Sequence, residues 1–106
     1  MPQRDRDDDQ VIVADLDHFK QINDTYGHAI GDKVLLRIST LIKGSIRPDD
    51  IFARWGGEEF VLLCRNTPLA NAQTVAEKLR QNIEQETFPF SSELRVTASF
   101  GVATFT

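Results

Sequence analysis

The fold of this chain is decided by the stretch Arg54-Trp55-Gly56-Gly57-Glu58-Glu59-Phe60. Its two glycines can adopt the positive φ angles of a two-residue hairpin turn. Apolar residues at 51–53 and 60–63 flank the turn and are typical of two paired strands. The stretch therefore predicts a β-hairpin that holds two glutamates at a rigid tip. Such a tip is also common in proteins without any site, so the tip alone does not define a function.

A second acidic group lies upstream, where the apolar run 11–14 is followed by Asp15 and Asp17. The run predicts a strand, and because side chains alternate across a strand, both aspartates project together if the strand continues that far. A hairpin paired beside this strand brings Glu58 into the same group. Carboxylates crowded in this way need a cation, and oxygen ligands that share their ion with a nucleotide triphosphate suit Mg²⁺. The alternative for an aspartate after a strand is helix N-cap, which we retain for Asp17.

Several motifs follow one another in a fixed order and spacing: Asp15-Leu16-Asp17-His18-Phe19-Lys20-Gln21-Ile22-Asn23-Asp24, Tyr26-Gly27-His28, Gly31-Asp32 and Gly56-Gly57-Glu58-Glu59-Phe60. Together they resemble the GGDEF domain of the diguanylate cyclase family, and the resemblance extends from Val11 to Thr106. It implies a palm-like α/β fold related to nucleotide cyclases and polymerases. It also implies that two GTP molecules are condensed to cyclic di-GMP with release of pyrophosphate. One domain of this family holds one GTP, so turnover would need a homodimer of domains.

The resemblance assigns the metal ligands to Asp15, the backbone carbonyl of Leu16 and Glu58, with Glu59 close enough to share or tune the ion. The ion would be Mg²⁺, with Mn²⁺ as the alternative. Glu58 is also the candidate general base for the attacking 3′-hydroxyl, a role that water can fill instead. Lys20 resembles the cation that faces the phosphates and completes the catalytic set with both glutamates. Without the resemblance, a lone lysine in a helix is usually a solvated surface residue.

Further residues resemble the substrate contacts of the family. Backbone N–H groups at His18 and Phe19, near a helix start, would join Lys20 in binding phosphate oxygens. Asn23 and Asp32 resemble the pair that reads guanine, since a carboxylate can accept from both N1–H and the exocyclic amine. The ordinary roles would be an Asx-turn for Asn23 and a helix-dipole partner for Asp32.

A possible regulatory motif is Arg47-Pro48-Asp49-Asp50, in which Arg47 lies nine residues before Gly56. It resembles the RxxD inhibitory site of the family. In that site Arg47 and Asp50 would bind the guanines of the product, cyclic di-GMP, away from the active site. The alternative is an ordinary polar turn between a helix and a strand.

The remaining pattern predicts the rest of the architecture. Apolar residues at helical spacing predict a helix over 29–46, and a second helix is expected with Thr67 as N-cap and Pro68 as its first residue. Alternation over 94–100 predicts a half-buried strand. The order strand, helices, hairpin, helix, strand predicts an α/β (α+β) sandwich. In it a mixed or antiparallel sheet carries helices on one face, with the hairpin tip beside the first strand.

Composition is consistent with one small domain over 11–106, preceded by a charged tail over 1–10 that holds six charged residues. The chain has 106 residues and a net charge of -4, so we expect no general nucleic-acid partner, which would require clustered Lys and Arg. The only cysteine, Cys64, falls in an apolar strand pattern and is expected to be buried. No apolar run reaches the roughly 18 residues of a membrane span, so we expect a cytoplasmic chain, although a full-length parent could be membrane-anchored.

The sequence also differs from the family pattern in length. Family domains begin with a helical segment that carries a DxLTGLxNR-like motif, and they end with a helix and strand whose Lys and Arg contact phosphates. The sequence contains neither segment. Two functions of different classes are therefore open: a diguanylate cyclase domain, and a catalytically incompetent GGDEF module that binds GTP or cyclic di-GMP for signalling. Ligand binding without turnover would favour the second.

Overall fold

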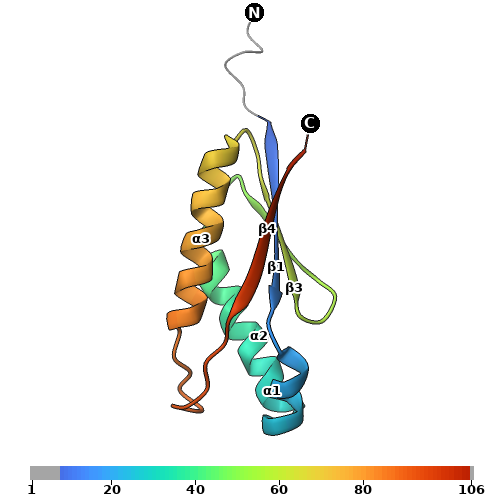
Figure 1. The fold of residues 1–106 in the computed structure, drawn as a ribbon, viewed down its shortest axis with the longest axis vertical. Helices are drawn as coiled ribbons and strands as arrows, with labels where there is room; N and C mark the ends of the chain where they lie inside the picture. The colour runs from blue at the N-terminus through green and yellow to red at the C-terminus, as the bar shows by residue number, and fades with distance from the viewer. Residues whose placement is uncertain (1–7, 106) are drawn as a thin grey trace, which may run out of the picture.

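The computed structural model describes residues 8–105. These residues form a four-stranded sheet in the order β2-β3-β1-β4, and every neighbouring pair is antiparallel. The helices α2 and α3 lie against one side of this sheet (Figure 1). The expected α/β sandwich is therefore confirmed, with the sheet antiparallel throughout. In chain order the elements are β1 (Asp9–Leu16), α1 (Phe19–Tyr26), α2 (His28–Lys43), β2 (Ile51–Trp55), β3 (Glu59–Cys64), α3 (Leu69–Gln85) and β4 (Ala98–Phe105).

The central strand is β1, which pairs with β3 on one side and β4 on the other. Its alternate residues Ile12, Ala14 and Leu16 are buried, whereas Val13 is 43% exposed on the opposite face. This period of two assigns one face of the strand to the core. The acidic residues at the end of β1 are thereby fixed by the same alternation that builds the core.

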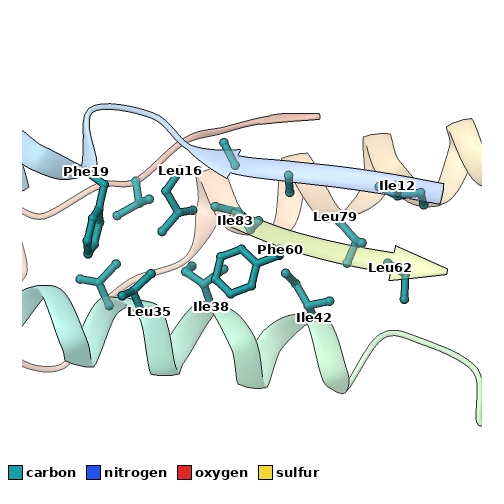
Figure 2. Packing of buried hydrophobic residues seen from close by; sticks show 14 of the residues in the cluster. Ile12, Leu16, Phe19, Leu35, Ile38, Ile42, Phe60, Leu62, Leu79 and Ile83 are labelled. Carbon is teal, nitrogen blue, oxygen red and sulfur yellow. The ribbon is translucent and has the colours of Figure 1, made fainter. Parts of the chain in front are cut away.

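The core fills the space between the sheet and the helices. Both α2 and α3 place apolar residues three and four positions apart on the face that meets the sheet, which is the pattern of an amphipathic helix. In Figure 2, Phe60 of β3 lies over Ile38 and Ile42 of α2. The buried residues of the two helices are Gly31, Val34, Leu35, Ile38 and Ile42 in α2, and Ala72, Ala76, Leu79 and Ile83 in α3.

Both long helices differ from the expected boundaries at one end. The helix expected over 29–46 ends at Lys43, because the N–H groups of Gly44 and Ser45 close the last turn on the carbonyls of Thr40 and Ile42. Ile46 therefore packs on the core from the following loop rather than from the helix.

The predicted N-cap of α3 is wrong by one residue. Pro68 is the cap, in an extended conformation, and the helix begins at Leu69. The Thr67 hydroxyl donates instead to the carbonyl of Arg65 at 2.8 Å and accepts from Arg47 at 2.8 Å. Because its hydroxyl already bonds to these two groups, Thr67 fixes the loop before α3 and does not cap the helix.

The hairpin forms as expected, but its turn is one residue longer. Residues 56–58 make the turn, and Trp55 pairs directly with Glu59. Of the two glycines only Gly56 has a positive φ, at 73°. The carbonyl of Glu58 accepts a hydrogen bond from the Leu16 N–H of β1 at 3.2 Å, which continues the pairing of β1 with β3 one residue beyond Asp15 and Glu59. Glu58 therefore lies in the turn while its backbone stays bonded to β1.

The two outer boundaries of the sheet also differ from expectation. β4 begins at Ala98, although Leu94 and Val96 before it are buried as the alternation predicted. At the other end β1 begins at Asp9, two residues inside the expected tail. Gln10 is buried there because its amide donates to the Thr67 carbonyl at 3.0 Å and accepts from Thr104 at 2.9 Å. Residues 1–7 of the expected tail lie outside the described residues.

Cys64 is buried at the end of β3, as expected, and burial raises the pKa of its thiol. Its environment is that of a small apolar core residue. Among the helices described for residues 8–105, none combines the length and the apolar character needed to cross a membrane.

The core assignment predicts a large difference between two neighbouring positions of α2. Ile38 is fully buried and Leu36 is 69% exposed. Ile38→Ala should lower the free energy of unfolding by about 3 kcal/mol, because it removes buried methyl groups and leaves a cavity. Leu36→Ala, the matched control, should change it by less than about 0.5 kcal/mol. Urea unfolding followed by circular dichroism measures both, and similar losses for the two variants would contradict this packing.

Candidate functional site

An acidic group forms where β1 meets the hairpin. Asp15 is the cross-strand partner of Glu59, so both side chains lie on the same face of the sheet. Glu58 occupies the turn beside them, joined to β1 by the hydrogen bond from the Leu16 N–H. The structure therefore brings together Asp15, Leu16, Glu58 and Glu59, the residues that the family resemblance groups as metal ligands.

The electrostatics of this group are unfavourable in the free chain. The Asp15 Oδ1 atom is buried and has no hydrogen-bond partner among the described residues. The pKa of the Glu58 carboxyl is raised above its usual range, first by burial and then by the negative charges of Asp15 and Glu59. An unpaired buried oxygen beside carboxylates that repel one another is an arrangement that a bound cation would relieve.

The chemistry of these donors fits a hard cation with an incomplete protein shell. Within residues 8–105 no three His, Cys, Asp or Glu side chains are arranged as a preformed metal cage. Mg²⁺ does not need one, since it is usually held by one or two carboxylates and completes its octahedron with water and phosphate oxygens. Asp15, Glu58 and the carbonyl of Leu16 supply oxygen ligands only, and they lie at the end of the central strand β1, beside the hairpin turn.

Asp17 has a role that the sequence did not suggest. Its carboxylate accepts hydrogen bonds from Thr97 Oγ1 at 2.8 Å and Ser99 Oγ at 2.7 Å, and its N–H donates to the Thr97 carbonyl at 2.9 Å. These bonds, Ser99 first and then Thr97, lower the pKa of Asp17. The retained interpretation of Asp17 as the N-cap of the first helix is therefore wrong, because its oxygens are bound to the segment around the start of β4 instead. The N-cap is His18.

The segment after Asp17 is held in a tight conformation. His18 has left-handed backbone angles, φ 57° and ψ 30°, and its carbonyl accepts hydrogen bonds from the N–H groups of Gln21 and Ile22. The ring of Phe19 is buried in the core, whereas the side chain of Lys20 is exposed in the first turn of α1. The first N–H groups of a helix have no intrahelical acceptor, so they are available to an anion beside Lys20.

The two residues expected to read a base lie on neighbouring helices. The side chain of Asn23 in α1 lies against Gly31 of α2, and Asp32 follows Gly31 in the chain. Asp32 is exposed and lines a cavity of about 310 Å³ between α2 and β2. No group in residues 8–105 hydrogen-bonds either side chain, so both amide and carboxylate are available to a ligand.

Arg47 and Asp50 lie at the far end of the hairpin, before β2. Their side chains form an ion pair at 3.0 Å, and the Arg47 N–H donates to Asp50 Oδ2 at 2.9 Å. The guanidinium also donates to the Thr67 hydroxyl. The Asp50 side chain is 5% exposed, whereas that of Arg47 is 57% exposed. The ion pair thus closes the turn over 47–50, and part of the Arg47 guanidinium remains exposed to solvent.

Sequence analysis missed three residues that support this site: Thr97, Ser99 and Gly31. The alternation over 94–100 marked Thr97 and Ser99 as outward positions, but nothing local indicated that β4 pairs beside Asp15 and Asp17. Gly31 stood within a quoted motif without a role, and only the contact between two helices reveals one.

Comparison with known proteins agrees with this geometry. Residues 2–106 match the family model described as "Diguanylate cyclase, GGDEF domain". Diguanylate cyclase A of Treponema denticola is 42% identical over 96 residues, which is 90% of this chain and 26% of that protein. A probable diguanylate cyclase of Escherichia coli, DgcT, is 43% identical over 94 residues, 86% of this chain and 21% of that protein. The chain thus spans about a quarter of these relatives.

Solved structures show the same fold. The active GGEEF domain of a diguanylate cyclase from Vibrio cholerae has a TM-score of 0.87 and 34% identity, and the match covers 98% of this chain and 66% of that one. The diguanylate cyclase SiaD of Pseudomonas aeruginosa, solved in complex with its activator SiaC, has a TM-score of 0.87 and 40% identity. The match covers 93% of this chain and 38% of that one.

The bonds to Asp17 predict a pH-dependent contribution to stability. Asp17→Ala should lower the free energy of unfolding at pH 7 by about 1 kcal/mol, since two exposed charge-assisted hydrogen bonds are lost. The pKa of Asp17 is lowered in the folded state, so its contribution is present above the ordinary aspartate pKa and is lost as pH falls through the folded value. The difference in the free energy of unfolding between wild type and Asp17→Ala should therefore become smaller below about pH 4.

Urea unfolding between pH 7 and pH 3 measures this difference, with Asp24→Ala as control because Asp24 is an exposed residue of α1. A constant gap across the range would contradict the role of the Asp17 charge.

Proposed function

The chain belongs to the GGDEF family of diguanylate cyclases, and we propose that it condenses two GTP molecules to cyclic di-GMP and pyrophosphate. The observation that carries this proposal is the buried, unpaired Asp15 oxygen beside Glu58 at the hairpin tip. A metal-dependent nucleotidyltransferase needs oxygen ligands of this kind at its reaction centre, and a cation would satisfy the unpaired oxygen.

We assign metal binding to Asp15, the carbonyl of Leu16 and Glu58, with Glu59 sharing or tuning the ion from its position opposite Asp15. Mg²⁺, or Mn²⁺ in its place, would neutralise negative charge on the reacting phosphates. The register between β1 and β3 holds these oxygens in place before substrate arrives, so little reorganisation is needed on binding.

The phosphates would lie at the start of α1. The left-handed residue His18 leads into the helix two residues after β1 ends, so the N–H groups at His18 and Phe19 and the exposed Lys20 side chain would meet phosphates bound beside the acids. Phe19 contributes only its backbone, because its ring is in the core. The hydrogen bonds that the Thr97 and Ser99 hydroxyls donate to Asp17 keep this segment in place.

Glu58 is also our candidate for the general base that takes the proton of the attacking 3′-hydroxyl. Its raised pKa gives the carboxylate a higher proton affinity, closer to the working pH, which favours proton transfer. A carboxylate engaged with metal loses part of that affinity, so water is the alternative acceptor. Asn23 and Asp32 would read guanine, with Asp32 accepting from the two adjacent donors that adenine lacks.

One such domain holds one of the two reacting GTP molecules, so the bond would form between two domains that face each other. The position of the acidic group at the end of β1, beside an exposed hairpin turn, is consistent with a second copy supplying the other substrate. The activity per mole should therefore rise with protein concentration until the dimer is saturated.

The first test is chromatographic detection of cyclic di-GMP after incubation with GTP and Mg²⁺ at high protein concentration. We expect product from wild type and at least a roughly 100-fold lower rate for Glu58→Ala, which removes a metal ligand. Glu84→Ala, an exposed position on α3, is the control and should retain the rate.

Folded wild type that binds GTP without forming product would instead favour the second candidate, a GGDEF module that signals by binding. The observation that favours this candidate is the Arg47–Asp50 pair, because the exposed guanidinium of Arg47 would bind cyclic di-GMP whether or not the acidic group turns over GTP.

We further propose that Arg47 and Asp50 form an inhibitory site for cyclic di-GMP. The GGDEF domain of DgcB from Caulobacter crescentus has been solved in complex with c-di-GMP, with 30% identity and a TM-score of 0.84. Here the pair lies at the end of the hairpin opposite the acidic tip, so product bound there would not compete directly with GTP. Binding would require Asp50 to exchange its bond with Arg47 for the N–H edge of guanine.

Arg47→Ala should raise the cyclic di-GMP concentration for half-inhibition by at least about tenfold, because one bidentate guanine contact is lost. The uninhibited rate should stay within about twofold. The measurement is initial rate against added cyclic di-GMP, with Arg65→Ala as control, since Arg65 contacts this turn only through its carbonyl. Unchanged inhibition in Arg47→Ala would remove the pair from regulation.

A further inference from the structure

Gly31 lies where any Cβ would meet the side chain of Asn23. It is buried in α2 directly against the Asn23 side chain of α1. A Cβ placed on Gly31 would lie 1.8 Å from Asn23 Oδ1, 3.0 Å from Asn23 Cγ and 3.3 Å from Cζ of Phe19. The first of these distances is far below van der Waals contact, so any side chain at position 31 would displace the Asn23 amide.

The backbones of the two residues cannot easily move apart. Gly27, with φ 93°, is the only residue between α1 and α2. Its N–H donates to the Asn23 carbonyl at 2.8 Å, and its carbonyl accepts from the Gly31 N–H at 3.1 Å. Both residues are thus bonded to the same corner, and the buried side chains of Phe19 and Ile22 hold α1 on the core. A clash at position 31 would have to be relieved by the Asn23 side chain itself.

Only packing fixes the Asn23 amide in the free protein. Within residues 8–105 no group hydrogen-bonds this side chain, so its rotamer depends on the surface it rests on. That surface is the bare backbone of Gly31, one residue before Asp32. Gly44 offers a contrast, because the nearest atom to a Cβ there is 3.5 Å away, an ordinary contact.

We propose that Gly31 is a positioning residue for base recognition: its missing side chain sets the Asn23 amide beside Asp32, so that the two together select guanine. This inference rests on the proposed function of Asn23 and Asp32. It adds that selectivity depends on the closeness of two helices and not only on the two polar side chains.

A Cβ at position 31 would require the amide oxygen to move by more than an ångström. Hydrogen bonds between an amide and a base have a narrow range of distance, and a displacement of this size removes them. Binding through the phosphates and the metal would not change, because those contacts lie at the start of α1 and on β1. Gly31→Ala should therefore lower affinity for a guanine nucleotide and leave affinity for an adenine nucleotide unaltered.

The test uses 3′-deoxy-GTP and 3′-deoxy-ATP with Mg²⁺, which lack the attacking hydroxyl, in calorimetric titrations of the whole chain. Wild type should prefer the guanine nucleotide. Gly31→Ala should bind it at least tenfold more weakly and bind the adenine nucleotide as wild type does, whereas Gly44→Ala should match wild type for both. The effect of Gly31→Ala should vanish in an Asn23→Ala background, because residues that act through one contact are non-additive.

The melting temperature without nucleotide is a second measurement, and it tests the contact between Gly31 and Asn23 even if the Gly31→Ala variant folds too poorly for titration. Gly31→Ala should lower the melting temperature, and adding Asn23→Ala should recover most of the loss, since it removes the atoms that clash. No recovery would overturn the contact. Retained guanine preference in Gly31→Ala would overturn the inference alone, whereas wild type without any guanine preference would overturn the assignment of Asn23 and Asp32 on which it rests.

Discussion

The register between β1 and β3 is the constraint on which the rest of this structure depends. Because side chains alternate along a strand, a slip of one residue would exchange the core face of β1 for its open face. The same slip would separate Asp15 from Glu59, its cross-strand partner. Core packing of Ile12, Ala14 and Leu16 therefore selects the register, and the register assembles the acidic group. The register between β1 and β3 therefore determines both the packing of the core and the geometry of the acidic group.

The segment after β1 is then fixed by contacts from three directions. Glu58 receives a backbone hydrogen bond from Leu16 on the hairpin side, and Asp17 binds the hydroxyls of Thr97 and Ser99 on the other side. The corner between α1 and α2 holds the far end of the short helix. A left-handed residue such as His18 persists where its surroundings over-determine it, and here both neighbouring segments do so.

The sequence was sufficient for the elements and for the family, because both depend on local patterns. Hydrophobic periodicity predicted the hairpin and the core faces of α2 and α3. The family was recognisable because each of its motifs is a short run of neighbouring residues. The sequence was insufficient where a contact joins distant segments. Asp17 and Ser99 are 82 residues apart, so the local sequence cannot show that Asp17 accepts this hydrogen bond instead of capping the helix that follows it. The contact between Gly31 and the Asn23 side chain likewise joins two helices, and neither helix predicts it alone.

Two aspartates separated by one residue show how environment divides structural from functional acids. Asp17 has both oxygens satisfied by hydroxyls, and its lowered pKa means that folding favours its charge. Asp15 has a buried oxygen without a partner, and it raises the pKa of Glu58 beside it. An arrangement that weakens the free protein persists where a ligand compensates for it. The unpaired oxygen of Asp15, more than the motif around it, is the observation on which the proposed cation and phosphate site at the end of β1 rests.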